Sequence, residues 1–156
     1  MAIGDTRTMQ QDVGFGMLQL VDIALRALSP GVNDPSTATD VIAHLGEVML
    51  AVWQRPTGER RRTIDGRTLI TVELDHSGHL AAAFDQIRRY GAQDLEVATT
   101  LVKALLLIRS EALRRTMCGS IEPIDDMLDL VVAGVDASNL LTADKDRVRA
   151  LLMESR

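Results

Sequence analysis

Polar residues gather around the end of the first apolar segment, and their types suit a small-ligand site. Residues 9–28 are apolar at nearly every position except for a polar stripe at helical spacing, formed by Asp12, Gln19, Asp22 and Arg26. The stripe leads into the loop LSPGVNDPSTA (28–38), which holds Asn33. Carboxylate, guanidinium and amide groups that converge in one pocket can bind a small polar molecule or enter an enzymatic site. The predicted ligand-binding residues are Asp22, Arg26, Asn33, Asp34, Asp85 and Arg88.

The same loop also has a structural interpretation. Pro30-Gly31 fits the centre of a type II turn that ends the first helix, and Asp34-Pro35 suits the N-cap and first position of the next helix. Asn33 would then take a left-handed or Asx-turn conformation. Both interpretations stay open, and the structural one is favoured because Asn usually has this role in turns.

Asp85 and Arg88, in the segment FDQIRRYG, lie one helical turn apart and have two interpretations of their own. They can pair with each other, or reach Asp22 and Arg26 if the two helices touch. A structural network of salt bridges is favoured, since buried charges need partners. The same cluster could instead bind a small anion or act as a switch.

The residue types that carry metal or nucleophile chemistry occur without the spacing that would specify it. His76 and His79 are three residues apart and could hold a metal with Asp75 or His44, but a strand end followed by a helix cap explains this segment equally. Cys118 has no histidine nearby in sequence, and neither a G-x-S-x-G motif nor a phosphate-binding glycine loop occurs. The sequence therefore predicts no catalytic residue, metal or cofactor, and favours a domain that is not an enzyme.

A basic patch stands out in the segment 55–67, where five arginines meet two acids, an excess of three positive charges. Arg60, Arg61 and Arg62 are its centre, and Asp65-Gly66 suits a two-residue hairpin turn between β-branched runs. Beside a bilayer, such residues are attracted to anionic lipid headgroups by about 1 kcal/mol each. The alternative is a solvated hairpin whose charges discourage edge pairing.

The elements that position these residues are predicted to be mainly helical. Residues 1–156 form one domain, a bundle of about six helices with a small β-hairpin insertion that rests on a helical surface. The first helix, apolar nearly all round, is expected to be central. The predicted helices span residues 9–28, 35–53, the Ser77 cap to Tyr90, the Asp94 cap to Leu113, Ile124 to Val131, and the Thr142 cap to Leu152.

Composition excludes several classes of protein. The net charge of −5 argues against a general affinity for nucleic acid, which needs a basic surface. The single cysteine excludes an internal disulfide and fits a reducing compartment. We find no signal peptide pattern and no apolar run long enough to cross a bilayer, so the chain is expected to be soluble.

The first quarter of the chain, with a second patch further on, resembles a known but uncharacterised family. The matching residues are Arg7-Thr8, Gln11-Asp12, Phe15-Gly16, the run 19–31, Asn33-Asp34-Pro35, Thr37-Ala38 and, further on, 84–91. They are similar to the start of the cytosolic region in bacterial predicted membrane proteins, the domain of unknown function 2254 family. The resemblance implies transmembrane helices ahead of this region, so the chain looks like an excised cytosolic domain or a member without its membrane part.

The expected function follows from that resemblance. The chain would act as a cytoplasmic regulatory or assembly module at the inner membrane, with its own transmembrane region as a partner. A homo-oligomer is also expected, because the apolar residues of the first and fourth helices exceed what one small core needs. The alternative is a ligand-binding or enzymatic domain that uses the polar residues around Asp22.

Overall fold

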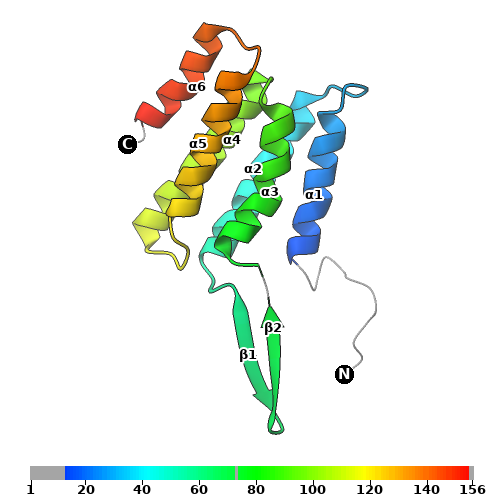
Figure 1. The fold of residues 1–156 in the computed structure, drawn as a ribbon, viewed down its shortest axis with the longest axis vertical. Helices are drawn as coiled ribbons and strands as arrows, with labels where there is room; N and C mark the ends of the chain where they lie inside the picture. Colours follow the sequence, from blue (N-terminus) through cyan, green and yellow to red (C-terminus); the bar gives the residue numbers. More distant parts are fainter. Residues whose placement is uncertain (1–12, 73, 155–156) are drawn as a thin grey trace.

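The described part of the chain, residues 13–72 and 74–154 of a computed structural model, is mainly helical, as predicted. Its elements follow one another along the chain as six helices and one hairpin (Figure 1). In order they are α1 (Val13–Ala27), α2 (Pro35–Trp53), β1 (Glu59–Ile64), β2 (Arg67–Val72), α3 (His76–Gly91), α4 (Leu95–Arg115), α5 (Glu122–Ala137) and α6 (Thr142–Glu154).

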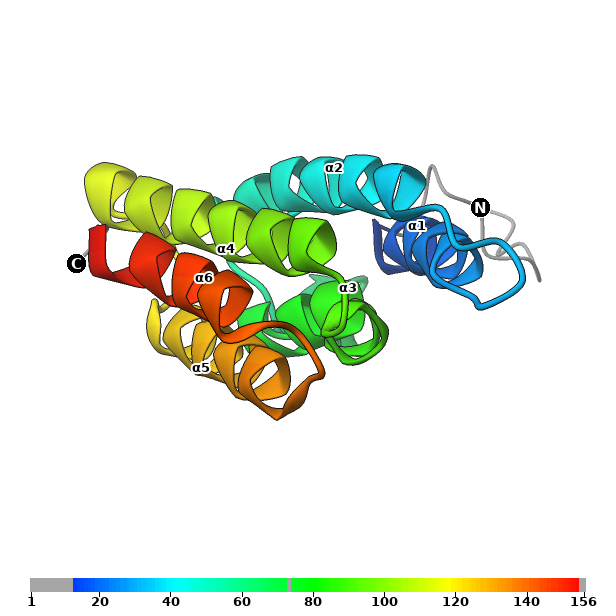
Figure 2. The same cartoon turned by 90° about the horizontal axis from the view of Figure 1, so that it is seen from above.

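The central helices are α3 and α4, and the expectation that the first helix is central is wrong. Among the described elements, α4 packs against α2, α3, α5 and α6, and α3 packs against α1, α2, α4 and α5. In the same part of the chain, α1 packs against α2 and α3 only. Figures 1 and 2 show α1 at one edge of the helical array and α6 at the opposite edge. The physical reason is that α1 buries only the stripe of Met17, Val21, Ala24 and Ala27, and its remaining apolar residues stay at least partly exposed.

The loop between α1 and α2 confirms one predicted cap and corrects one predicted turn. Asp34 is the N-cap of α2 and Pro35 its first residue, as expected. Gly31 has no positive φ, so the turn is not type II. Asn33 has the left-handed conformation that the structural interpretation predicted, with φ of 49°, and the amides of Val32 and Asn33 both donate to the Ser29 carbonyl. The backbone thus forms one further turn after α1, and the chain changes direction at Asn33.

Two further helix starts differ from prediction by a few residues. α3 is capped by Asp75, whose Oδ1 accepts from the Gly78 amide at 2.7 Å, and not by Ser77. Thr142 is the first residue of α6 and not its cap. The predicted cap of α4 is confirmed, because Asp94 accepts from the Val97 amide at 2.9 Å. Asp and Ser are both common N-cap residues, so either one near the start of a helix fits the capping pattern. This explains why the predicted helix starts are wrong by one or two residues.

The hairpin is where predicted in sequence but not in space. Asp65 and Gly66 both have positive φ, as a two-residue type I′ turn requires, and Ile64 pairs with Arg67 on either side of it. The strands contact each other and, within the described residues, no helix. Figure 1 shows this β1–β2 ribbon extending away from the helices, so the expectation that it rests on a helical surface is wrong.

Candidate functional site

Three of the predicted ligand-binding residues are exposed at the α1 edge of the molecule. Asp22 and Arg26 lie on the outer side of α1, and Asn33 lies in the loop that follows. Neither the Asp22 carboxylate nor the Arg26 guanidinium forms an ion pair or hydrogen bond with any part of the chain that the structure describes. The polar stripe of α1 is therefore a surface feature. Asp12, its first expected member, lies outside the described residues.

Asp34 is occupied by its own helix. Its two carboxylate oxygens accept from the hydroxyls of Ser36 and Thr37, each at 2.6 Å, and from the Thr37 amide at 3.2 Å. These hydrogen bonds, that from Ser36 first, lower the pKa of Asp34 from 3.8 to about 2. The carboxylate is thereby held ionised at the positive end of the α2 dipole. Its acceptors are used within the turn and do not converge with Asp22 or Arg26.

Asp85 and Arg88 pair with each other, in the favoured arrangement. The Arg88 guanidinium donates to Asp85 Oδ1 and that of Arg89 to Oδ2, both at 2.5 Å. The Arg88 side chain is 15% exposed, and its Nε is buried without a hydrogen-bond partner among the described residues. α1 and α3 do touch, but no ion pair joins Asp85 or Arg88 to the stripe of α1. The ligand-binding hypothesis for these residues stays a prediction.

The arginines of the predicted membrane-facing patch lie on the β1–β2 ribbon. Arg60 is paired with Thr71, Arg61 with Ile70 and Arg62 with Leu69. Arg61 and Arg67 are exposed, and so is Ile70, at 52%. Since directly opposite residues of an antiparallel pair lie on one face, Arg61 places a cationic side chain beside the apolar side chain of Ile70.

The base of the ribbon is held by His76, which the sequence suggested only as a weak metal ligand. Its Nε2 lies 3.0 Å from the Arg55 carbonyl oxygen and its Nδ1 lies 3.0 Å from the Thr57 hydroxyl. A carbonyl can only accept, so Nε2 carries a proton, and in the neutral ring Nδ1 accepts from Thr57. Both ring nitrogens are therefore used in fixing the segment between α2 and β1 against the start of α3.

Trp53 extends this anchor to the other side of the fold. Its ring is fully buried and its Nε1 donates to the Ser120 carbonyl at 3.2 Å. Its own carbonyl accepts from the Cys118 amide at 3.0 Å and the Gly119 amide at 3.3 Å. The loop between α4 and α5 is thus bonded to the end of α2 at the point from which the ribbon leaves. The only sequence signal for this contact was the single tryptophan, placed at the predicted end of a helix.

The other two histidines use one nitrogen each within their own helices. His44 Nδ1 contacts the Asp40 carbonyl at 2.7 Å, and His79 Nδ1 contacts the Asp75 carbonyl at 2.8 Å. No group of three His, Cys, Asp or Glu side chains suited to a metal ion occurs within residues 13–72 and 74–154.

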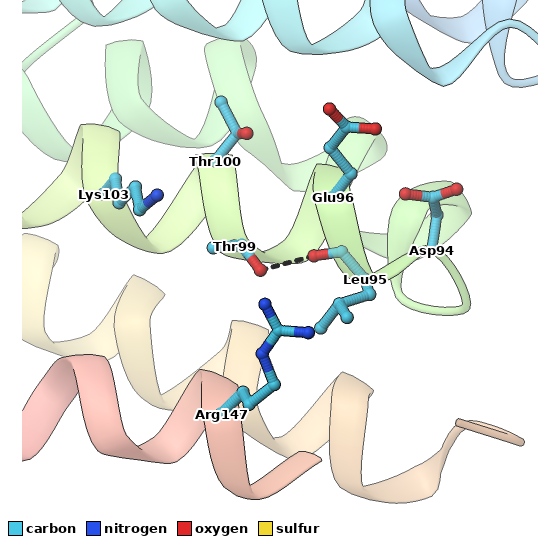
Figure 3. Close-up of a pocket in the computed structure, with 7 residues that line it drawn as sticks. All are labelled: Asp94, Leu95, Glu96, Thr99, Thr100, Lys103 and Arg147. Atoms are coloured by element: carbon cyan, nitrogen blue, oxygen red, sulfur yellow. Dashed lines mark hydrogen bonds between the residues drawn. The ribbon is translucent and has the colours of Figure 1, made fainter. Parts of the chain in front are cut away.

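A pocket of about 470 Å³ lies between the first turns of α4 and the side of α6. Its lining residues are Asp94, Leu95, Glu96, Thr99, Thr100, Lys103 and Arg147. Figure 3 shows Arg147 reaching from α6 toward the start of α4. The two cations are balanced by two carboxylates, and Asp94 and Thr99 are already bonded within α4. The pocket thus has no net charge that would select an anion or a cation. The sequence did not predict this pocket, because Arg147 lies far along the chain from the other lining residues.

Comparison with known proteins shows that the chain is similar to an uncharacterised family of predicted membrane proteins. Residues 1–106 match the family model described as "Predicted membrane protein (DUF2254)". Uncharacterized proteins of Mycobacterium bovis and of two Mycobacterium tuberculosis strains are 43% identical over 105 residues, which is 66% of this chain. The chain spans only 20% of the length of these relatives. No solved structure matches it. Within the described residues, no helix is long and apolar enough to cross a bilayer.

Proposed function

The chain belongs to the family of predicted membrane proteins that its first 106 residues match, and we propose that it is the cytoplasmic regulatory or assembly domain of such a protein. In this proposal the β1–β2 ribbon contacts anionic lipid headgroups at the membrane to which the rest of the protein is bound. The remaining four fifths of the relatives' length leave room for membrane-spanning segments outside the region aligned with this chain.

The observation that carries the proposal is the free-standing ribbon. A two-stranded hairpin alone in water is marginally stable, and this one packs against no described helix. Apart from its anchored base, its stabilising contacts must come from its own pairing or from a surface outside the described chain. A ribbon that extends from the body is well placed to reach such a surface (Figure 1).

The charges of the ribbon indicate what kind of surface that is. An excess of three positive charges in residues 55–67 contrasts with a net charge of −5 for the whole chain. An anionic bilayer attracts the basic ribbon and repels the acidic remainder of the chain, so the domain would orient with the ribbon toward the lipid. Exposed Ile70, paired with Arg61, adds an apolar side chain that suits the headgroup boundary.

The test is vesicle flotation with the chain as it stands. We expect binding to vesicles of phosphatidylserine and phosphatidylcholine at low salt, little binding to phosphatidylcholine alone, and loss of binding as salt shortens the screening length. The triple variant Arg60→Gln, Arg61→Gln, Arg62→Gln should lose about tenfold or more in its partition to anionic vesicles, because each arginine near the surface contributes about 1 kcal/mol.

The matched control changes three exposed arginines on helices, Arg114, Arg115 and Arg147, to glutamine. It removes the same total charge from the chain but leaves the ribbon intact. We expect it to bind anionic vesicles as the unmodified chain does. Equal binding of the chain to both kinds of vesicle, or equal loss in the two triple variants, would contradict the proposal.

A further inference from the structure

The outer side of α1 is a partly apolar surface with an unusual pair of charges. Leu18 and Ile23 are 43% and 46% exposed there. Asp22 and Arg26 lie between and beside them, and the spacing of four residues puts Leu18, Asp22 and Arg26 in one row along the helix. Large side chains exposed together on an edge helix usually mark a contact with another surface.

The two charges on this surface are not used within the described chain. An Asp and an Arg four residues apart on a helix commonly pair, as Asp85 does with Arg89 in α3. Asp22 and Arg26 have the same spacing and order, but the Asp22 carboxylate and the Arg26 guanidinium form no ion pair or hydrogen bond with the described residues. When a second copy of this face is turned by 180° and laid against the first, the anion of each copy lies opposite the cation of the other.

We infer that this face of α1 binds a second copy of the chain across a two-fold axis. The axis passes between Asp22 and Arg26, the two α1 helices run antiparallel, and Asp22 of each copy meets Arg26 of the other. In a closed two-fold interface both copies contribute the same surface, so each contact between two different residues occurs twice. The contact between Asp22 and Arg26 has this form. This names the partner for the proposed assembly role but does not depend on the lipid contact.

The apolar residues fit the same arrangement. With the axis at the level of residue 24, Leu18 of one copy is brought toward the loop that follows α1 in the other, where Val32 is 60% exposed. Ile23 flanks the charge pair and would be covered by the second helix. A single helix pair is a small interface, so the dimer is expected to be weak in solution and favoured when copies are concentrated on one membrane.

Sedimentation equilibrium over a wide range of concentrations tests the inference. The unmodified chain should pass from monomer to dimer as its concentration rises. Asp22→Arg and Arg26→Asp should each weaken the dimer by about tenfold or more, because each sets like charges against each other twice. The matched controls are Asp129→Arg on α5 and Lys103→Asp on α4, which reverse exposed charges elsewhere and should leave the dissociation constant unchanged.

The deciding experiment mixes the two single variants. Each alone has like charges within its own α1 and should stay monomeric, but in an equimolar mixture one copy presents two cations and the other two anions. We expect the mixture to form a heterodimer, which a loss of helix stability within one copy could not produce. Circular dichroism checks that both variants remain folded. A monomeric unmodified chain at every concentration, unchanged dimerisation of Asp22→Arg, or a mixture that stays monomeric would each overturn the inference.

Discussion

The indole ring of Trp53 and the imidazole ring of His76 lie with their centroids 5.1 Å apart and their planes inclined by 59°. One residue ends α2 and the other begins α3, so the ring contact joins the two helices on either side of the hairpin. Together with the bonds from His76 to Arg55 and Thr57, it fixes where the ribbon leaves the body.

Replacing His76 by alanine should loosen the base of the ribbon. The change removes two hydrogen bonds and the ring contact, and should lower the free energy of unfolding by about 1–2 kcal/mol. Amide hydrogen exchange should accelerate more in β1 and β2 than in α4. His79→Ala is the matched control, because His79 lies in the same helix and its ring, among the described residues, hydrogen-bonds with the Asp75 carbonyl and not with the segment before β1. Equal effects of the two variants on strand exchange would show that His76 does not hold the ribbon.

Gly119→Ala should destabilise the fold because of its contact with Trp53. A Cβ at residue 119 would lie 2.5 Å from Trp53 Nε1, and the Trp53 ring is fully buried. We expect a loss of about 1–3 kcal/mol in thermal or urea unfolding. Gly16→Ala is the control: nothing lies within 4 Å of its Cβ position, and alanine favours the helix, so stability should stay the same or rise. A harmless Gly119→Ala would mean that the loop between α4 and α5 does not pack closely on Trp53.

Acid should weaken the cap of α2 over a defined pH range. The pKa of Asp34 is lowered to about 2 in the folded chain from 3.8, so its ionised form stabilises the fold above pH 4. This contribution is lost as the pH falls from about 4 toward 2, since the folded state must then take up the proton. Asp34→Asn should therefore unfold more easily at neutral pH and show a smaller change in stability over that range.

Two hydroxyl variants separate the cap from general acid effects. Ser36→Ala removes the hydrogen bond that lowers the pKa of Asp34 most, and should reduce the same acid dependence in part. Thr39→Ala should not, because the Thr39 hydroxyl donates to the Ser36 carbonyl and not to Asp34. An identical acid unfolding curve for Asp34→Asn and the unmodified chain would contradict the prediction.

The sequence predicted local structure well because local residues decide it. Asp34-Pro35 and Asp65-Gly66 each contain the chemistry of a cap or turn within two residues, and both act as expected. The type II turn failed for a related reason: Gly31 permits a positive φ, but Asn33 adopts it two residues later. Both residues tolerate that conformation; the left-handed Asn33 is confirmed and the positive φ expected at Gly31 is wrong.

The arrangement of elements was harder to predict because it depends on contacts between distant residues. α1 is apolar nearly all round and looked central, but an apolar surface can face a core or another molecule, and periodicity does not distinguish the two. The bonds between Trp53 and the loop at Ser120 span 67 residues, and the pocket joins the start of α4 to Arg147. Neither could be found from spacing along the chain.

The length of the ribbon has an electrostatic consequence. Six residues in each strand carry the turn at Asp65-Gly66 about 20 Å from the base. This distance exceeds the Debye length of about 8 Å at physiological salt. Arg67, which directly follows the turn, is therefore largely screened from the acidic helices. The electrostatic potential that an approaching surface experiences is therefore that of a cationic ribbon end or that of an anionic helical body. The net charge of the chain describes neither of these.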